Sequence, residues 1–272
     1  MKISTILNVH NQPDLVIDTL DSVLEYMTED VLVVIDGASN EFDNIDLPVH
    51  KMRGFKHGIA KSPYRNVALG LYSLYQLFPE SDWYCYLEYD CLVTSTRFKD
   101  NLKMADERDV WMLGSDGHID DKSIPVVESM IGGPFHSSYY LLGACQFFSQ
   151  VFMRKLMEFQ FFERFLNNTN SFGSDSMPGY SGYDVSEHLY PSLCRQFGGN
   201  IGVFSSWDAA EQEWHGSYKV FPIRWQPEIN AETESFEEAS IIHPLKDLDH
   251  PIRKYHRKVR NVSKRKKYSH AT

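Results

Sequence analysis

Short apolar runs that end in polar residues recur along the first third of the chain. Residues 2–9 and 31–35 are runs typical of buried strands. Polar residues at 11–14 end the first run, and apolar side chains then recur at helical spacing: Leu15, Ile17, Leu20, Val23 and Leu24. A strand, a helix and a strand in this order predict a right-handed βαβ unit, and therefore a parallel sheet.

A third apolar run, 83–87, leads into two carboxylates one residue apart, Glu88 and Asp90. The alternation of a strand places both acids on one side. Ligands of open α/β sheets collect beyond the carboxyl ends of the strands, so this pair favours a hard divalent cation that holds a phosphate-bearing ligand. A solvated strand end explains the same two acids without a function.

Other candidate ligand-binding residues follow the second strand. Asp36 can accept hydrogen bonds from a ribose hydroxyl or a base N–H, although an ordinary Asp-Gly turn explains it equally. Residues 53–58 form a basic, glycine-containing loop that can embrace a phosphate. Arg65 lies in the first turns of a helix expected at 62–78, where it can pair with a diphosphate or remain a surface arginine.

The later part of the chain predicts helices at 94–104, 149–165 and 183–197, and strands at 48–52, 110–114, 141–148 and 199–204. The Gly, Pro and Asp-rich segment 115–137 predicts an acceptor-side lid or a disordered loop. Asp184, at the start of its helix, can act as a general base or cap the helix, with Glu187 completing a capping box.

Composition limits the class of protein. With 272 residues, 42% hydrophobic and 14% aromatic, the chain can bury a sizeable core. It shows no signal peptide and no apolar run of about 18 residues, the length of a membrane span. Its four cysteines are scattered without metal-site spacing, which favours reduced thiols and a cytoplasmic location.

Charge is distributed unevenly. Residues 253–267 carry nine Lys or Arg and no acid, so the remaining 18 basic and 37 acidic side chains leave the body with a net charge of −19. An acidic body argues against nucleic-acid binding. We expect the basic end to be solvated and disordered, or to contact an anionic membrane or an acidic partner.

Four segments in order resemble family-two glycosyltransferases of the GT-A fold: 3–11 with 19–24, then 33–39, 58–70 and 88–90. The resemblance implies an α/β fold, a GT-A-like mostly parallel central sheet flanked by helices. It further implies a single domain over 1–252, with a Rossmann-like nucleotide-sugar-binding half at 1–95 and an acceptor-binding half at 96–252. The basic tail, 253–272, follows.

The resemblance also implies a metal-dependent transfer of a sugar from a UDP- or GDP-sugar donor to an acceptor hydroxyl, with inversion. Glu88 and Asp90 match the metal motif for Mn²⁺ or Mg²⁺, and His243 is the candidate third ligand, with His215 as its rival. The donor would be held by the following residues: Asp36, Arg65, Lys56, Asn66 and His10.

On the acceptor side, the resemblance implies that Asp184 takes the proton of the attacking hydroxyl, with Glu187 as its substitute. A glycan, a lipid-linked molecule or another hydroxyl compound would be the acceptor. The scattered cysteines place such an enzyme in the cytoplasm, and its basic tail offers a peripheral contact with an anionic membrane or an acidic partner.

Two positions differ from the family pattern. Glu88 stands where the first metal-motif aspartate is expected, and Asp36 is a single acid where two are usual. These differences keep a second hypothesis open, a catalytically degenerate sugar- or nucleotide-binding or scaffold module. A sugar-phosphate nucleotidyltransferase is a third, but residues 8–13 lack the glycine-rich nucleotide loop that it requires.

Overall fold

A computed structural model describes residues 1–56, 62–120, 128, 134–167, 185–203, 223–224 and 239–269. Its central sheet has seven strands in the order β3-β2-β1-β4-β7-β6-β8. Their bounds are Ile3–Val9 (β1), Val31–Ile35 (β2), His50–Arg53 (β3), Trp83–Glu88 (β4), Val110–Ile119 (β6), Tyr139–Ser149 (β7) and Asn200–Val203 (β8). Neighbouring strands are parallel except where β7 pairs with β4 and β6. The predicted α/β fold with a mostly parallel sheet is confirmed.

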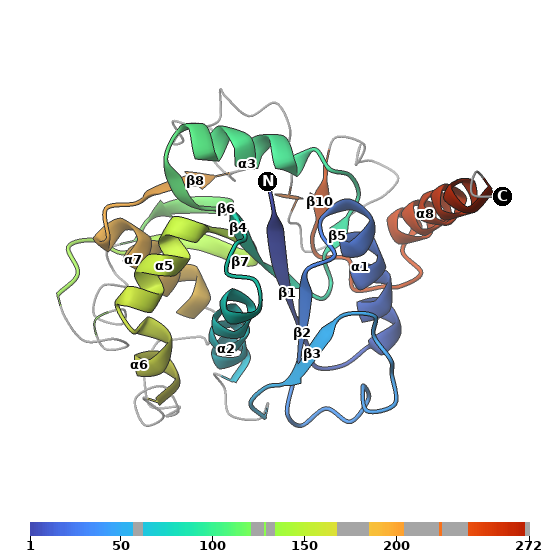
Figure 1. Cartoon of the computed structure of the whole chain (residues 1–272), viewed down its shortest axis with the longest axis horizontal. Helices are drawn as coiled ribbons and strands as arrows, with labels where there is room; N and C mark the ends of the chain where they lie inside the picture. Colours follow the sequence, from blue (N-terminus) through green and yellow to red (C-terminus); the bar gives the residue numbers. More distant parts are fainter. Residues whose placement is uncertain are drawn as a thin grey trace.

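Helices cover both faces of this sheet (Figure 1). Their bounds are Pro13–Tyr26 (α1), Ser62–Leu77 (α2), Phe98–Glu107 (α3), Gln150–Glu158 (α5), Phe161–Asn167 (α6), Val185–Leu189 (the π-helix η2), Tyr190–Gln196 (α7) and Pro251–Ser269 (α8). Apolar side chains of α1 and α3 pack with one face of the sheet, and those of α2, α5, α6 and α7 pack with the other. Because both faces are covered, the residues of β1, β2 and β4 are almost continuously buried, and those of β2 are all apolar.

A second, three-stranded sheet lies beside the first, in the order β5-β10-β9. It consists of Leu92–Val93 (β5), Ile241–Ile242 (β10) and Ile223–Arg224 (β9). β10 runs antiparallel to β5, which follows β4 after a short turn. The pairing thereby brings β10 close to the end of β4.

The structure corrects several expected elements. Helix 149–165 is two helices, because Gln160 adopts a positive φ of 54° between α5 and α6. Residues 115–119 of the expected lid continue strand β6, while 121–127 and 129–133 lie outside the described residues. Ile17, expected on the inner face of α1, is 37% exposed.

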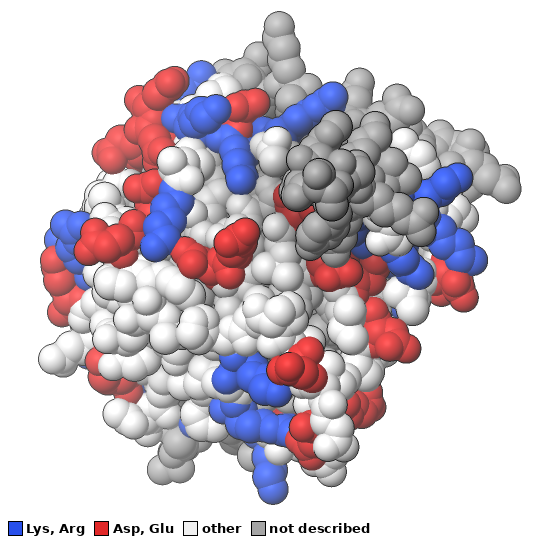
Figure 2. Space-filling view, turned by 45° about the vertical axis from the view of Figure 1, so that its right-hand side comes forward, with Lys and Arg blue, Asp and Glu red and all other residues white. Residues whose placement is uncertain are grey.

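The basic end is also different from the expectation. Residues 251–269 form helix α8, and Ile252 and Arg253 at its start are fully buried. The helix packs against α1 (Figure 1). A disordered end is therefore wrong for this segment. On the face shown in Figure 2, basic and acidic side chains of the described residues are interspersed, so the excess of acids forms no single patch there.

The four cysteines are buried free thiols, as expected from their spacing. Among the described residues, no helix is both long and apolar enough to cross a membrane.

Candidate metal centre

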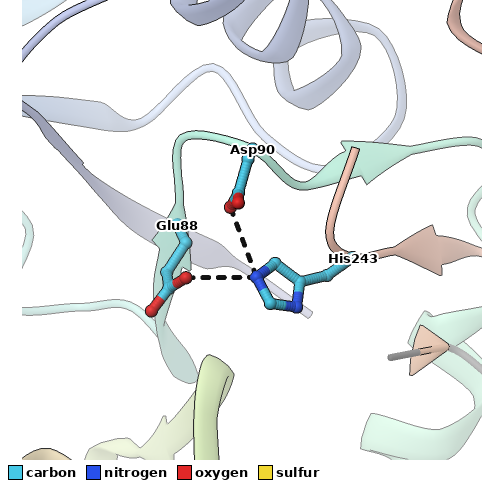
Figure 3. A group of neighbouring side chains, drawn as sticks. All are labelled: Glu88, Asp90 and His243. Carbon is cyan, nitrogen blue, oxygen red and sulfur yellow. Dashed lines mark hydrogen bonds and ion pairs between the residues drawn. The ribbon is translucent and has the colours of Figure 1, made fainter. Parts of the chain in front are cut away.

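Three segments bring the candidate metal ligands together at the carboxyl edge of the sheet (Figure 3). Glu88 is the last residue of β4, and Asp90 lies on the turn between β4 and β5. His243 directly follows β10. The antiparallel pairing of β10 with β5 carries this histidine back to the acidic turn, and a hydrogen bond of 2.9 Å from the Leu245 N–H to the Asp90 carbonyl fixes the two segments.

One imidazole nitrogen faces both carboxylates. His243 Nε2 lies 3.1 Å from Glu88 Oε2 and 3.3 Å from Asp90 Oδ1. One ligand atom from each of the three residues can be chosen so that all lie within 4.8 Å of one another. Lys246 Nζ lies 4.0 Å from the other Asp90 oxygen, near the limit of an ion pair.

The three side chains differ in their exposure to solvent. The side chains of Asp90 and His243 are 3% and 7% exposed, whereas that of Glu88 is 38% exposed. Burial lowers the pKa of His243, but the close carboxylates of Asp90 and Glu88 outweigh it and raise this pKa to about 9. Burial raises the pKa of Asp90, yet the contact with His243 leaves it below its ordinary value. Without a cation, a proton on the imidazole offsets one of the two carboxylate charges.

The donor set suits a divalent cation. Two carboxylates supply the hard oxygen ligands that Mn²⁺ and Mg²⁺ take, and an imidazole adds a nitrogen ligand acceptable to Mn²⁺. Asp90 Oδ1 is buried and makes no well-aligned hydrogen bond with the described residues, although His243 lies near it. A buried carboxylate oxygen without an aligned donor is suited to bind a cation. Glu88, Asp90 and His243 are therefore the residues that would hold the ion.

Asp36 lies at the same edge of the sheet, directly after β2. β1 stands between β2 and β4, and all three strands are parallel, so their carboxyl ends point the same way. The Asp36 carboxylate is buried and accepts a hydrogen bond of 2.8 Å from the Ala38 N–H. Gly37 beside it allows a close approach of the next loop, because a Cβ here would lie 2.6 Å from the Gly54 carbonyl oxygen.

That loop carries the predicted donor residue Lys56, and helix α2 carries Arg65 and Asn66. Lys56 is exposed. Arg65 lies with its guanidinium 3.9 Å from the centre of the Phe55 ring and donates to the Leu166 carbonyl. Asn66 accepts from the Phe55 N–H at 2.6 Å and donates to the Phe55 carbonyl at 3.2 Å, so its amide holds the loop in place.

His10 lies at the carboxyl end of β1. Its ring meets the Tyr89 ring edge to face, with the centroids 5.1 Å apart. Because Tyr89 separates Glu88 from Asp90 in the chain, the predicted donor residue His10 lies beside the candidate metal ligands.

Of the two candidate bases, the structure describes Glu187. Its Oε1 accepts a hydrogen bond of 3.0 Å from the Gly143 N–H on β7, and β7 pairs with β4 up to Leu87 and Cys145. Glu187 therefore lies near the end of β4, on the side away from Asp36. Asp184 and the rival histidine His215 lie outside the described residues.

Sequence reasoning missed the buried polar residues behind the metal centre. Asp18 and Thr19 interrupt the apolar face of α1, and both are buried. Arg253, Arg257 and Arg260 all contact Asp18. The spacing of these arginines, four and three residues apart, is that of one helix face and was the available signal.

No protein-family model and no curated protein matches the sequence. Structural matches include a mannosyltransferase from Pyrobaculum calidifontis in complex with GDP-Man and Mn²⁺, with 15% identity and a TM-score of 0.35 over 57% of this chain and 46% of that one. A cytidylyltransferase from Leptospira borgpetersenii has 12% identity and a TM-score of 0.40, over 77% and 78% of the two chains. Mouse xyloside xylosyltransferase 1, in its apo form, has 10% identity and a TM-score of 0.40, over 75% of this chain and 85% of that one.

The chain spans less than half the length of the mannosyltransferase that it matches. Identities between 10% and 15% carry no activity from one protein to another.

Proposed function

We propose that this protein is a metal-dependent glycosyltransferase that moves a sugar from a nucleotide-diphosphate donor to an acceptor hydroxyl. The observation that carries the proposal is the convergence of Glu88, Asp90 and His243 at the carboxyl edge of a mostly parallel sheet. Ligands of open α/β sheets bind at this edge. Asp36, at the same edge, gives the site a second acidic group suited to a nucleoside.

On the donor side, Asp36 accepts a hydrogen bond from the ribose or base of a UDP- or GDP-sugar. Glu88, Asp90 and His243 would hold Mn²⁺ or Mg²⁺, which when bound would offset the charge that builds on the departing diphosphate. Lys56, exposed on its loop, supplies further positive charge. His10 borders this space beside Tyr89.

On the acceptor side, a carboxylate takes the proton of the attacking hydroxyl while that oxygen bonds to the anomeric carbon from the face opposite the diphosphate. The bond to the diphosphate breaks, and the configuration inverts. Asp184 is the first candidate for this base, and Glu187 is the second. The position of Glu187 near the end of β4 supports an acceptor on the β7 side of the metal centre.

A binding module without catalysis is the second candidate. The longer Glu88 side chain and the single acid at Asp36 favour it, because both weaken the donor site relative to the family pattern. Such a module would bind nucleotides but would not transfer a sugar.

The test is the thermal stability of the full chain with nucleoside diphosphates and nucleotide sugars, each in Mn²⁺, Mg²⁺ or EDTA. A ligand that binds the folded state raises the unfolding temperature by mass action. A metal-dependent shift for one base, followed by release of nucleoside diphosphate from its sugar with an added acceptor, supports the enzyme. A shift without turnover supports the binding module, and no shift with any nucleotide contradicts both.

Asp90→Asn and Asp100→Asn form a matched pair for this test. Both replace a carboxylate with an amide, but Asp100 is exposed and pairs with Lys103 on α3. The proposal requires the metal-dependent shift to disappear in Asp90→Asn and to persist in Asp100→Asn.

A further inference from the structure

A buried arginine outside the metal centre connects the segments that carry its ligands. Arg253, on α8, has no exposed surface. Its Nε donates to the Leu245 carbonyl at 2.8 Å, and its Nη2 donates to the Cys91 carbonyl at 3.0 Å. Its Nη1 lies 2.8 Å from Asp18 Oδ2 and 3.2 Å from Thr19 Oγ1 on α1. One guanidinium therefore bridges α1, α8 and two other segments.

The two carbonyls lie next to the candidate ligands in the chain. Cys91 directly follows Asp90, and Leu245 comes two residues after His243. The Leu245 N–H also donates to the Asp90 carbonyl at 2.9 Å. The position of the His243 segment relative to the Asp90 turn is thus set by the pairing of Ile242 with Leu92, by that backbone hydrogen bond and by Arg253.

Thr19 supports the same turn from the other side. Its Oγ1 lies 2.7 Å from the Tyr89 carbonyl and 2.8 Å from the Cys91 carbonyl, within donating distance of each. The Thr19 hydroxyl and the Arg253 guanidinium therefore hold the backbone of the acidic turn. The Asp90 carboxylate on this turn faces His243.

Only arginine can make this set of contacts. The planar guanidinium presents five N–H donors in fixed directions, whereas a lysine ammonium is a point charge on a flexible stem. Lysine would retain the ion pair with Asp18 but could not reach both carbonyls with the same geometry. A metal centre tolerates errors of only about half an ångström in the position of its ligands.

We propose that Arg253 is a positioning residue that fixes His243 against the Asp90 turn, so that metal affinity depends on an ion pair outside the metal centre. The inference rests on the proposed metal-dependent function. It gives α8, the basic end of the chain, a role at the metal centre through its first turn.

The experiment compares Mn²⁺ binding by calorimetry in the full chain and in two matched variants, Arg253→Lys and Arg257→Lys. Arg257 also pairs with Asp18, but its other hydrogen bond goes to the Leu248 carbonyl, away from the ligands. Loss of a residue that orients metal ligands typically weakens affinity about 10- to 100-fold. We expect that loss in Arg253→Lys and a clearly smaller one in Arg257→Lys, because the other contact of Arg257 is with the Leu248 carbonyl and not with a segment bonded to the Asp90 turn. Equal losses in both variants, or none in Arg253→Lys, would overturn the proposal.

A second measurement works without metal. Amide hydrogen exchange in EDTA follows the Leu245 N–H, which is bonded to the Asp90 carbonyl, and the core amides of β1. Arg253→Lys should accelerate exchange at Leu245 at least about tenfold and leave β1 unchanged. Unchanged exchange at Leu245 overturns the positioning role.

If the unaltered protein binds no Mn²⁺, the metal assignment of the proposed function fails while the exchange result still decides the role of Arg253. Should Arg253→Lys fail to fold, Thr19→Val offers a milder change, because it removes a hydroxyl from the same turn at nearly constant volume. It should accelerate Leu245 exchange in the same direction, and unchanged exchange would again contradict the proposal.

Discussion

His243 Nε2 lies 3.1 Å from Glu88 Oε2, although 155 positions separate the two residues in the chain. Asp90 Oδ1 is 3.3 Å from the same nitrogen. One ring nitrogen between two carboxylates can hold a proton or give its lone pair to a cation, but not both. Protons and metal ions should therefore compete for this site.

Replacement of Asp90 by asparagine should abolish metal-dependent activity and leave the fold intact. The amide keeps the size of the buried side chain but removes the charge that attracts the cation. We expect Mn²⁺ affinity and turnover to fall by at least about 100-fold. Calorimetry and a nucleotide-release assay measure these losses, with Asp100→Asn as the exposed control. Unchanged turnover with added Mn²⁺ would show that the ion is not held here.

The stability of the metal-free protein should fall as the pH rises from 6.5 to about 9. The pKa of His243 is raised from its ordinary value of 6.5 to about 9, so the folded state binds this proton more tightly than the unfolded chain does. The resulting stability is complete below pH 6.5 and is lost as the pH passes through about 9. By linkage it amounts to about 3 kcal/mol.

Urea unfolding in EDTA across this pH range measures the effect, and His243→Gln should remove its contribution to the slope. Saturating Mn²⁺ should weaken or reverse that contribution, because binding requires the neutral imidazole. An identical slope in the protein and in His243→Gln would mean that His243 does not carry the proton.

The sequence alone predicts the acidic half of the candidate metal centre because its signal is local. An apolar run followed by Glu88 and Asp90 defines both the strand and the edge at which it ends. The position of His243 has no such local signal, because it depends on the antiparallel pairing of β10 with β5. No local pattern encodes a pairing between segments so far apart, and only the family resemblance suggested this residue.

Helix α8 shows how charge composition can mislead. Nine basic residues without an acid favour a solvated end, yet Arg253 and Arg260 are buried because they contact the single carboxylate of Asp18. Asp18 lies beside Ile17, and a rotation of the helix by one position exchanges which of them faces inward. Helical periodicity shows which side of a helix is buried. It does not show which residues lie at the middle of that side when polar and apolar residues are mixed there.

The two candidate bases can be separated by Asp184→Asn and Glu187→Gln. Each amide keeps the shape of its acid but cannot accept the proton of the acceptor hydroxyl. The variant that removes the base should lower sugar transfer by about 100-fold or more and leave donor affinity unchanged. Single-turnover transfer and calorimetric donor affinity measure the two effects.

Glu187→Gln retains an oxygen that can accept from the Gly143 N–H, so the contact between η2 and β7 should persist. Equal losses of transfer and donor affinity in either variant would identify a structural cap. Full transfer in both would place the base elsewhere.

Gly37 should be required for nucleotide binding because a larger residue would separate two loops at the donor edge. In Gly37→Ala the new Cβ would lie 2.6 Å from the Gly54 carbonyl oxygen and 3.0 Å from the Lys56 nitrogen, both backbone atoms that cannot rotate away. We expect a loss of about 1–3 kcal/mol in the free energy of unfolding, with at least about tenfold weaker binding of a nucleoside diphosphate.

The control is Gly198→Ala, which is destabilising for a different reason. Gly198 has a positive φ of 85° and no atom within 4 Å of an added Cβ, so the cost, about 1–2 kcal/mol, is backbone strain far from the donor edge in the chain. Its affinity for the nucleoside diphosphate should equal that of the unaltered protein. Because both variants lose stability, only a difference in affinity assigns the loop beside Asp36 to the nucleotide. Equal affinities in the two variants would remove Gly37 and its neighbours from the donor site.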